Sequence, residues 1–93
     1  MKIIFDKLPK KAKKKKDVLY DVLEKAEDSL YSISKVDYNT GTITFESLLN
    51  DVIIIQYYVS TGTIVTFNKI KHKTKYFRRL KTEEIKNHFK QLK

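Results

Sequence analysis

The order of apolar and polar positions along the chain predicts one long helix, several strands and a short final helix. Between residues 10 and 30, apolar side chains recur every three or four positions, which is the spacing of one face of an amphipathic helix. Pro9 stands at its start, where a missing N–H is harmless. The apolar segment 2–5 is a candidate first strand. The stripe of the helix consists of Val18, Leu19, Val22, Leu23, Ala26 and Leu30.

Four segments in the middle of the chain have strand character. Residues 31–38 end at the turn signal Asn39-Thr40-Gly41, and residues 42–46 alternate with Ile43 and Phe45 on the inner side. Residues 52–59 are so apolar that they predict a central strand. Residues 63–70 follow a break that contains Gly62, and we expect them to pair with the central strand as a hairpin.

The end of the chain predicts a basic connection and a last helix. Residues 71–81 form a basic loop or a strand extension. Thr82 is the expected cap of the helix, Glu83 and Glu84 fall in its first turn, and Ile85, Phe89 and Leu92 form its buried stripe. The predicted fold is a single α+β domain over residues 1–93: an amphipathic N-terminal helix packed on a four-stranded antiparallel sheet, with a short C-terminal helix.

Charge is distributed unevenly along this pattern. Residues 1–16 carry a net charge of +7, residues 17–68 carry −6, and residues 69–93 carry +8, within a total of +9. Two basic ends therefore bracket an acidic middle. If the fold brings the ends together, they form a positive face suited to a polyanion. The simpler interpretation is that the lysines keep a small protein soluble.

Several chemistries are excluded by composition. The chain has no cysteine, and its two histidines have no metal-binding spacing, so we expect no metal site. Two glycines, both at turns, cannot form a phosphate-binding loop, and no cofactor is expected. The N-terminal apolar segment is too short for a signal peptide and the longest apolar run is too short to cross a bilayer. We therefore expect a cytoplasmic protein without a membrane partner.

The remaining candidate for chemistry is the basic cluster of residues 69–79. In an extended segment, alternate residues share a face, so its four lysines would form a row spaced ~7 Å apart, close to the phosphate spacing of a nucleic-acid strand. His72, among positive neighbours, is a candidate proton acceptor, whereas the simpler interpretation is a solvated histidine. Aromatic and guanidinium groups add faces for base stacking. The predicted catalytic residues are His72, Tyr76 and Arg79, and the predicted nucleic-acid-binding residues are Lys69, Lys71, Lys73, Lys75, Arg78, Lys13 and Lys14.

The second half of the chain also resembles a known family. Residues 57–67, then residues 71–75 and 82–85, resemble the C-terminal half of RelE/HigB-type toxins of the RelE/ParE superfamily, in particular its phage-derived branch. The similar features are an aromatic strand, a glycine turn, an aliphatic strand, a basic segment with Thr74 and a final helix that opens with Glu84-Ile85. Residues 8–11, Leu-Pro-Lys-Lys, look like the start of the family's N-terminal helix.

The resemblance implies a toxin of a toxin–antitoxin system that acts as a ribosome-dependent mRNA endonuclease. Its implied partners are RNA, the ribosome and a cognate antitoxin protein, and Lys71, His72 and Lys73 would lie in the RNA-contacting cluster. The residues themselves leave two alternatives open. One is a non-catalytic basic module that binds nucleic acid, and the other is a protein-binding module such as a phage-type inhibitor.

Overall fold

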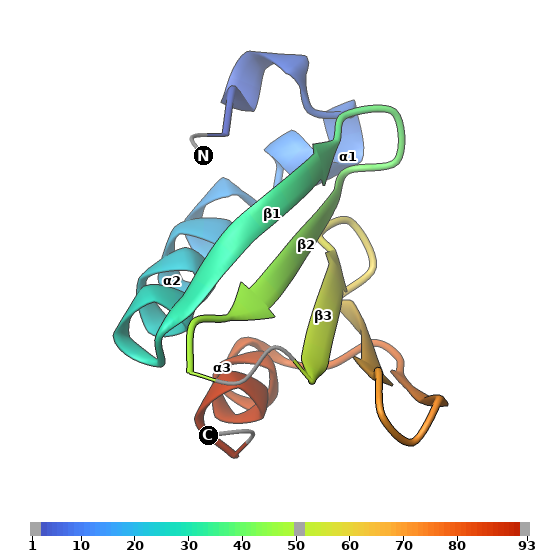
Figure 1. Ribbon diagram of the computed structural model, residues 1–93. Coiled ribbons are helices and arrows are strands. Elements are labelled where there is room, and N and C mark those ends of the chain that lie inside the picture. The colour runs from blue at the N-terminus through green and yellow to red at the C-terminus, as the bar shows by residue number, and fades with distance from the viewer. Residues whose placement is uncertain (1–2, 50–51, 92–93) are drawn as a thin grey trace.

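The computed structural model describes residues 3–49 and 52–91, which form three α-helices, a short 3-10 helix and one antiparallel sheet (Figure 1). No helix within these residues is long and apolar enough to cross a membrane. In chain order the elements are η1 (Phe5–Lys7), α1 (Lys10–Lys13), α2 (Lys16–Asp28), β1 (Tyr31–Asp37), β2 (Thr42–Ser47), β3 (Ile53–Tyr58), β4 (Thr63–Asn68), β5 (Lys73–Phe77) and α3 (Thr82–Gln91).

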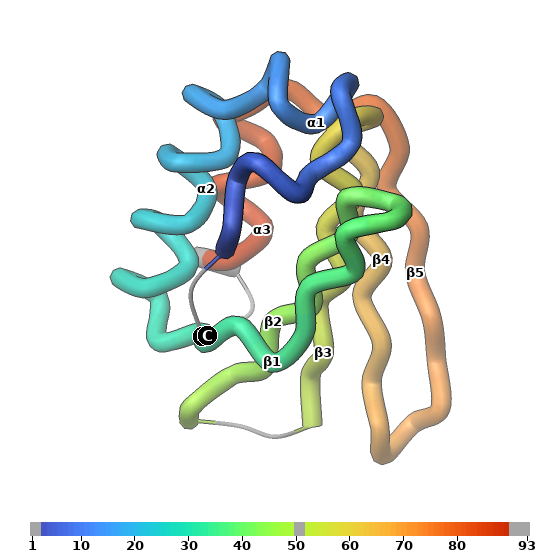
Figure 2. Tube along the Cα trace, turned by 90° about the horizontal axis from the view of Figure 1, so that it is seen from above, coloured from blue at the N-terminus to red at the C-terminus, as the bar shows by residue number. Residues whose placement is uncertain are grey.

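The sheet is a meander in which each strand pairs with the next in the sequence, in the order β1-β2-β3-β4-β5. The expected central strand is confirmed, because β3 lies in the middle of the five. Helices α2 and α3 lie on one side of the sheet, and the other side is uncovered (Figure 2). One face of the sheet therefore belongs to the core and the other is available for function.

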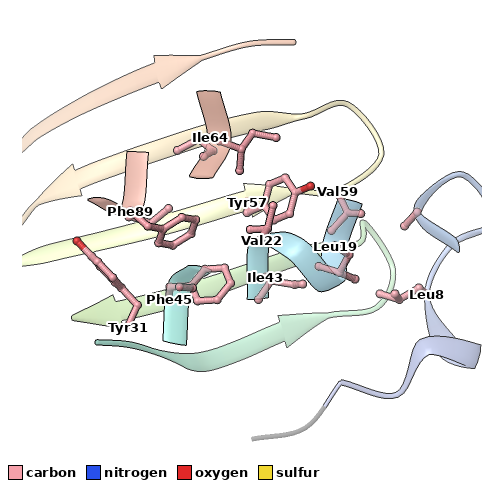
Figure 3. Packing of buried hydrophobic residues seen from close by; sticks show 14 residues of the cluster. Leu8, Leu19, Val22, Tyr31, Ile43, Phe45, Tyr57, Val59, Ile64 and Phe89 are labelled. Carbon is pink, nitrogen blue, oxygen red and sulfur yellow. The ribbon is translucent and has the colours of Figure 1, made fainter. Parts of the chain in front are cut away.

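The core forms between α2, α3 and the inner face of the sheet (Figure 3). Ile43 and Phe45 of β2 point into it, as the alternation predicts. Phe89 of α3 meets the rings of Phe45 and Tyr31 edge to face, with centroid distances of 5.0 and 5.3 Å. This aromatic contact joins the last helix to the first two strands and stabilises the packing of α3 on the sheet.

The prediction of four strands is wrong, because the sheet has five. The missed strand is β5, which pairs with β4 from Lys73 opposite Asn68 to Phe77 opposite Ile64. Four of its five residues are exposed, so it has little of the apolar alternation that marks the other strands. An edge strand that carries lysines is a common protection against pairing with other chains.

The helix predicted over residues 10–30 is divided into α1 and α2 at Lys14 and Lys15. The break falls inside a run of lysines, where like charges three and four residues apart repel and positive charge opposes the dipole at a helix start. Leu30 lies outside the helix with a φ of 62° and is 41% exposed, so it does not belong to the buried stripe. Leu19, Val22 and Ala26 of that stripe are buried, as expected.

Two smaller expectations at the ends of the chain are also wrong. The described part of segment 2–5 is not a strand, and Phe5 begins η1 instead. Thr82 is the first helical residue of α3 rather than its cap. Lys81 precedes the helix, and its backbone N–H donates a hydrogen bond to Oε1 of Glu84 at 3.1 Å. Ile85 and Phe89 are buried as predicted, while Leu92 lies outside the described residues.

The turn between β3 and β4 is fixed to the segment that leads into α3. Gly62 has a φ of 70°, and its carbonyl oxygen accepts the backbone N–H of Leu80 at 2.9 Å. A Cβ at position 62 would lie 2.9 Å from the carbonyl oxygen of Leu80. At Gly41, where φ is 69°, a Cβ would lie 3.2 Å from the Cβ of Ala12. The two glycines share a left-handed backbone but differ in what surrounds them.

We expect Gly62→Ala to destabilise the fold more than Gly41→Ala. Each substitution places a side chain on a left-handed backbone, which costs ~1–2 kcal/mol. Only Gly62→Ala also forces a backbone oxygen to move. Denaturant unfolding of both variants measures the difference, and an equal loss of unfolding free energy would contradict the close approach of Leu80 to the turn.

Candidate nucleic-acid interface

The uncovered face of the sheet is built from the alternate residues of the strands that do not enter the core. Directly paired residues lie on the same face of a sheet. One row across β3, β4 and β5 is Gln56, Val65 and Tyr76. The neighbouring rows are Ile54, Phe67 and Thr74 on one side, and Tyr58 with Thr63 on the other.

Two shallow hollows lie side by side on this face and share Val65 and Tyr76. Val65 is only 8% exposed, whereas the Tyr76 side chain is 64% exposed. Tyr76 is therefore a raised aromatic ring that is accessible from both hollows. The first hollow, about 300 Å³, is also lined by Ile54, Gln56, Phe67 and Thr74, and the second, about 200 Å³, by Tyr58, Thr61, Thr63 and Arg78.

The acidic middle of the sequence lies mainly away from this face. Glu46 of β2 is on the open face, and its Oε1 lies 3.6 Å from Nζ of Lys69. Asp37, which is opposite Thr42 on the same face, accepts the backbone N–H groups of Asn39 and Thr40 in the β1–β2 turn. The five acids of α2, all exposed, belong to the helical layer on the other side of the sheet: Asp17, Asp21, Glu24, Glu27 and Asp28.

The predicted row of four lysines is wrong, because Lys69 and Lys71 lie in the turn between β4 and β5. The side chain of Asn68 forms this turn by accepting the backbone N–H groups of Ile70 and Lys71 at 3.0 and 2.9 Å. Lys73 and Lys75 do share one face of β5. They lie opposite Asn68 and Thr66, on the helical side of the sheet and at its free edge.

The structure does not bring His72, Tyr76 and Arg79 together. His72 precedes β5 in the turn and Arg79 follows its end, so the five residues of β5, roughly 17 Å, separate them. Both have a positive φ, of 52° and 54°. Proton transfer needs groups within hydrogen-bond reach of one reacting atom. Only Tyr76 of the three lines the open face, beside Arg78.

The N-terminal lysines lie at the same end of the sheet as one part of the basic segment 69–79 and at the opposite end from the other part. The β4–β5 turn with His72 lies at the end away from α1 (Figure 2). The segment after β5 returns to the α1 end, where Leu80 bonds to Gly62 in the β3–β4 turn. Lys13 ends α1 and Lys14 follows it, so these two lysines share an end of the sheet with Arg78 and Arg79 but not with His72.

The sequence interpretation missed most residues that line the hollows. Residues 52–59 were predicted as a central strand from their apolar content, without a distinction between its two faces, although Gln56 and Tyr58 lie two positions apart within this run. A polar side chain and a phenol on the same face of a strand were a signal that this face is open. On β4, the alternate residues Thr63, Val65 and Phe67 lie on this same open face.

His88 packs between α3 and β5. Its ring meets Phe77 edge to face at 4.2 Å, and its Nε2 is buried without a hydrogen-bond partner among the described residues. Burial lowers the pKa of the imidazole. Burial also raises the pKa of the Tyr57 hydroxyl to about 12, so this core residue is uncharged. Among residues 3–49 and 52–91, no group of three or more acidic or histidine side chains could hold a metal ion.

We expect the stability of the fold to fall as pH decreases below about 6.5. The unfolded chain binds a proton at His88 at its ordinary pKa, while the folded protein, whose pKa is lower, does not. Unfolding free energy measured between about pH 7.5 and 5.5 should therefore fall in the wild type and fall less in His88→Leu. The matched control is His72→Asn, since His72 is exposed. An identical pH dependence of wild type and His88→Leu would contradict the buried neutral imidazole.

Comparison with protein-family models, with curated proteins and with solved structures found no match to this chain. The resemblance to RelE/HigB-type toxins therefore stays a prediction, and the geometry of the open face carries the functional argument.

Proposed function

We propose that the protein is a basic module that binds single-stranded RNA on the open face of its sheet. The observation that carries this proposal is the pair of hollows that meet at Tyr76, with Tyr58 and Phe67 on the neighbouring strands. A base in either hollow can stack on the ring of Tyr76, and stacking on an aromatic side chain contributes ~1–3 kcal/mol per base.

The positive charge is placed to bind the backbone of such a strand. Arg78 lines the second hollow, and the β4–β5 turn brings Lys69 and Lys71 to the opposite end of β5. A strand that follows β5 passes cations at both ends with the exposed ring of Tyr76 between them. Arginine and lysine bind phosphates, and aromatic faces take unstacked bases.

The negative charge of the helical layer also favours RNA binding on the open face of the sheet. Five exposed acids of α2 make the helical side unfavourable for a polyanion. On the open face, Glu46 lies near Lys69 and Asp37 accepts backbone N–H groups of the β1–β2 turn. The electrostatic field of such an uneven charge distribution orients an approaching nucleic acid toward the sheet. The binding module does not need His72 and Arg79 to converge, whereas cleavage by proton transfer would.

Fluorescence anisotropy with a labelled single-stranded RNA tests this proposal. We expect Tyr76→Ala to weaken binding roughly tenfold, because one base loses its stacking partner. Tyr20→Ala is the matched control: Tyr20 is also an exposed tyrosine, on α2, and its removal should leave the affinity unchanged. Arg78→Gln should lower the slope of log affinity against log salt by about one.

Three outcomes would count against the open face. Affinity that does not depend on salt would exclude a phosphate-binding module. An equal loss of RNA affinity in Tyr76→Ala and Tyr20→Ala would show that the hollows do not bind the RNA. Loss of binding in a Lys13→Gln, Lys14→Gln variant, with no change in Tyr76→Ala, would move the site to the lysine run. The integrity of the RNA after incubation, with and without ribosomes, tests the predicted endonuclease in the same samples.

A further inference from the structure

A second surface lies on the helical side of the molecule, where α2 separates from the edge strand β1. A cavity of about 680 Å³ opens there, larger than either hollow of the open face. We call this cavity the α2–β1 wedge. Its lining is mainly apolar and comes from α2 (Tyr20, Leu23, Ala26, Glu27), from β1 and β2 (Tyr31, Ser32, Ile33, Phe45), from the N-terminal segment (Ile3, Phe5) and from Leu48 after β2.

The N-terminal segment closes one part of the α2–β1 wedge. The rings of Phe5 and Tyr20 are 4.7 Å apart, with Nζ of Lys16 5.7 Å from each ring centroid. The backbone N–H of Ile4 donates to the hydroxyl of Tyr38 at 3.0 Å. These contacts fix the segment to α2 and to the end of β1, so the N-terminal segment forms one wall of the wedge.

Exposed apolar side chains occur in the segments that form the wedge. Of the seven large apolar side chains that are exposed in the described chain, two line the wedge, Tyr20 and Leu48, and three are next in sequence to residues that line it. The β2 end is tied to the residue before β1, because the backbone N–H of Leu48 donates to the carbonyl oxygen of Leu30 at 2.8 Å. Exposed apolar side chains beside an apolar cavity are typical of a docking site. The five are Ile4, Tyr20, Leu30, Leu48 and Leu49.

The helix that forms one wall of the wedge, α2, is acidic. Glu27 lines the wedge and Glu24 and Asp28 are exposed on the same helix, while Lys16 lies beside the lining rings of Phe5 and Tyr20. In total, α2 carries five acidic residues and two lysines, Lys16 and Lys25. A partner that covers the wedge therefore needs an apolar surface flanked by cations.

The shape of the wedge favours a helix over an added strand. β1 has an irregularity in its pairing between Ile33 and Lys35, and Lys35 is exposed on this edge strand. Both features protect an edge against strand addition. On the other wall, Tyr20, Leu23 and Glu27 recur at three- and four-residue spacing, which is the ridge that packs against another helix.

We propose that the α2–β1 wedge receives an amphipathic helix of a partner protein, with an apolar stripe flanked by lysine or arginine. A second copy of this chain offers no such helix within its described residues, because α2 and α3 bury their apolar sides in the core and α1 has four residues. The proposal uses a face other than the RNA surface and does not depend on it.

A synthetic helical peptide provides the test. The probe is about 14 residues long, which matches the ~20 Å length of α2, with leucines at helical spacing and lysines beside them. Its control has the same leucines with glutamates in place of the lysines. We expect saturable binding of the lysine peptide by fluorescence anisotropy, and binding of the glutamate peptide at least tenfold weaker. No saturable binding of the lysine peptide, or equal binding of both peptides, would overturn the proposal.

Two matched variants assign the binding to the wedge. Leu48 lines it and is 67% exposed, while Ile70 is 71% exposed in the β4–β5 turn. We expect Leu48→Asn to weaken peptide binding about tenfold and Ile70→Asn to leave it unchanged. Equal effects of the two variants would overturn the assignment, as would sedimentation that shows a dimer dissociated by Leu48→Asn, since the wedge would then bind a second copy.

The same variants separate this proposal from the RNA proposal. Leu48→Asn should keep the RNA affinity of the wild type, and Tyr76→Ala should keep the peptide affinity, because the two residues lie on different surfaces. Thermal unfolding of each variant shows that it is folded. Loss of peptide binding in Tyr76→Ala as well would mean that the wedge is not the site.

Discussion

The packing of α2 and α3 against one face of the sheet is the interaction on which the rest of the structure depends. Phe89 is central to it, because its ring contacts Phe45 and Tyr31 while Leu19 and Val22 complete the core from α2 (Figure 3). The chain has only these two helices of appreciable length within its described residues, and they cover one face. The open face and the α2–β1 wedge are consequences: the first lies on the side without helices, and the second lies where α2 diverges from β1.

The fold could be predicted from the sequence wherever burial is one-sided. Ile43 and Phe45 alternate with polar neighbours, and both are in the core. β5 could not be found in this way, because an edge strand has one free side and its residues Lys73 to Lys75 are polar. Spacing alone also placed Lys69 and Lys71 on an extended segment, whereas the side chain of Asn68 turns the chain there.

The candidate site was predicted only in part. The sequence drew attention to Tyr76 and Arg78, which line the second hollow, but it grouped them with His72 and Arg79, which the length of β5 separates. The contribution of Gln56, Val65 and Phe67 depends on the pairing register, which joins residues from three strands into one surface. A motif that is continuous in the sequence can be found by inspection, whereas a surface formed across strands needs the register.

The segregation of charge follows from the same architecture. The acidic middle segment contains α2, so its negative charge lies mainly on the helical layer, and the basic last segment supplies β5 and its two ends. The result is a molecule with two surfaces of opposite character: an aromatic sheet with cations beside it, and an apolar wedge beside acids. Each surface suits a different kind of partner.

The central claim is that the open face of the sheet is the RNA-binding surface. The most direct measurement is a titration of isotope-labelled protein with single-stranded RNA, followed by the backbone amide NMR signals. The account predicts that the largest shifts occur along β3, β4 and β5, with Gln56, Val65 and Tyr76 among them, and that residues of α2 stay unchanged. Shifts confined to residues 10–16 would contradict it, because the lysine run and not the sheet would then bind the RNA.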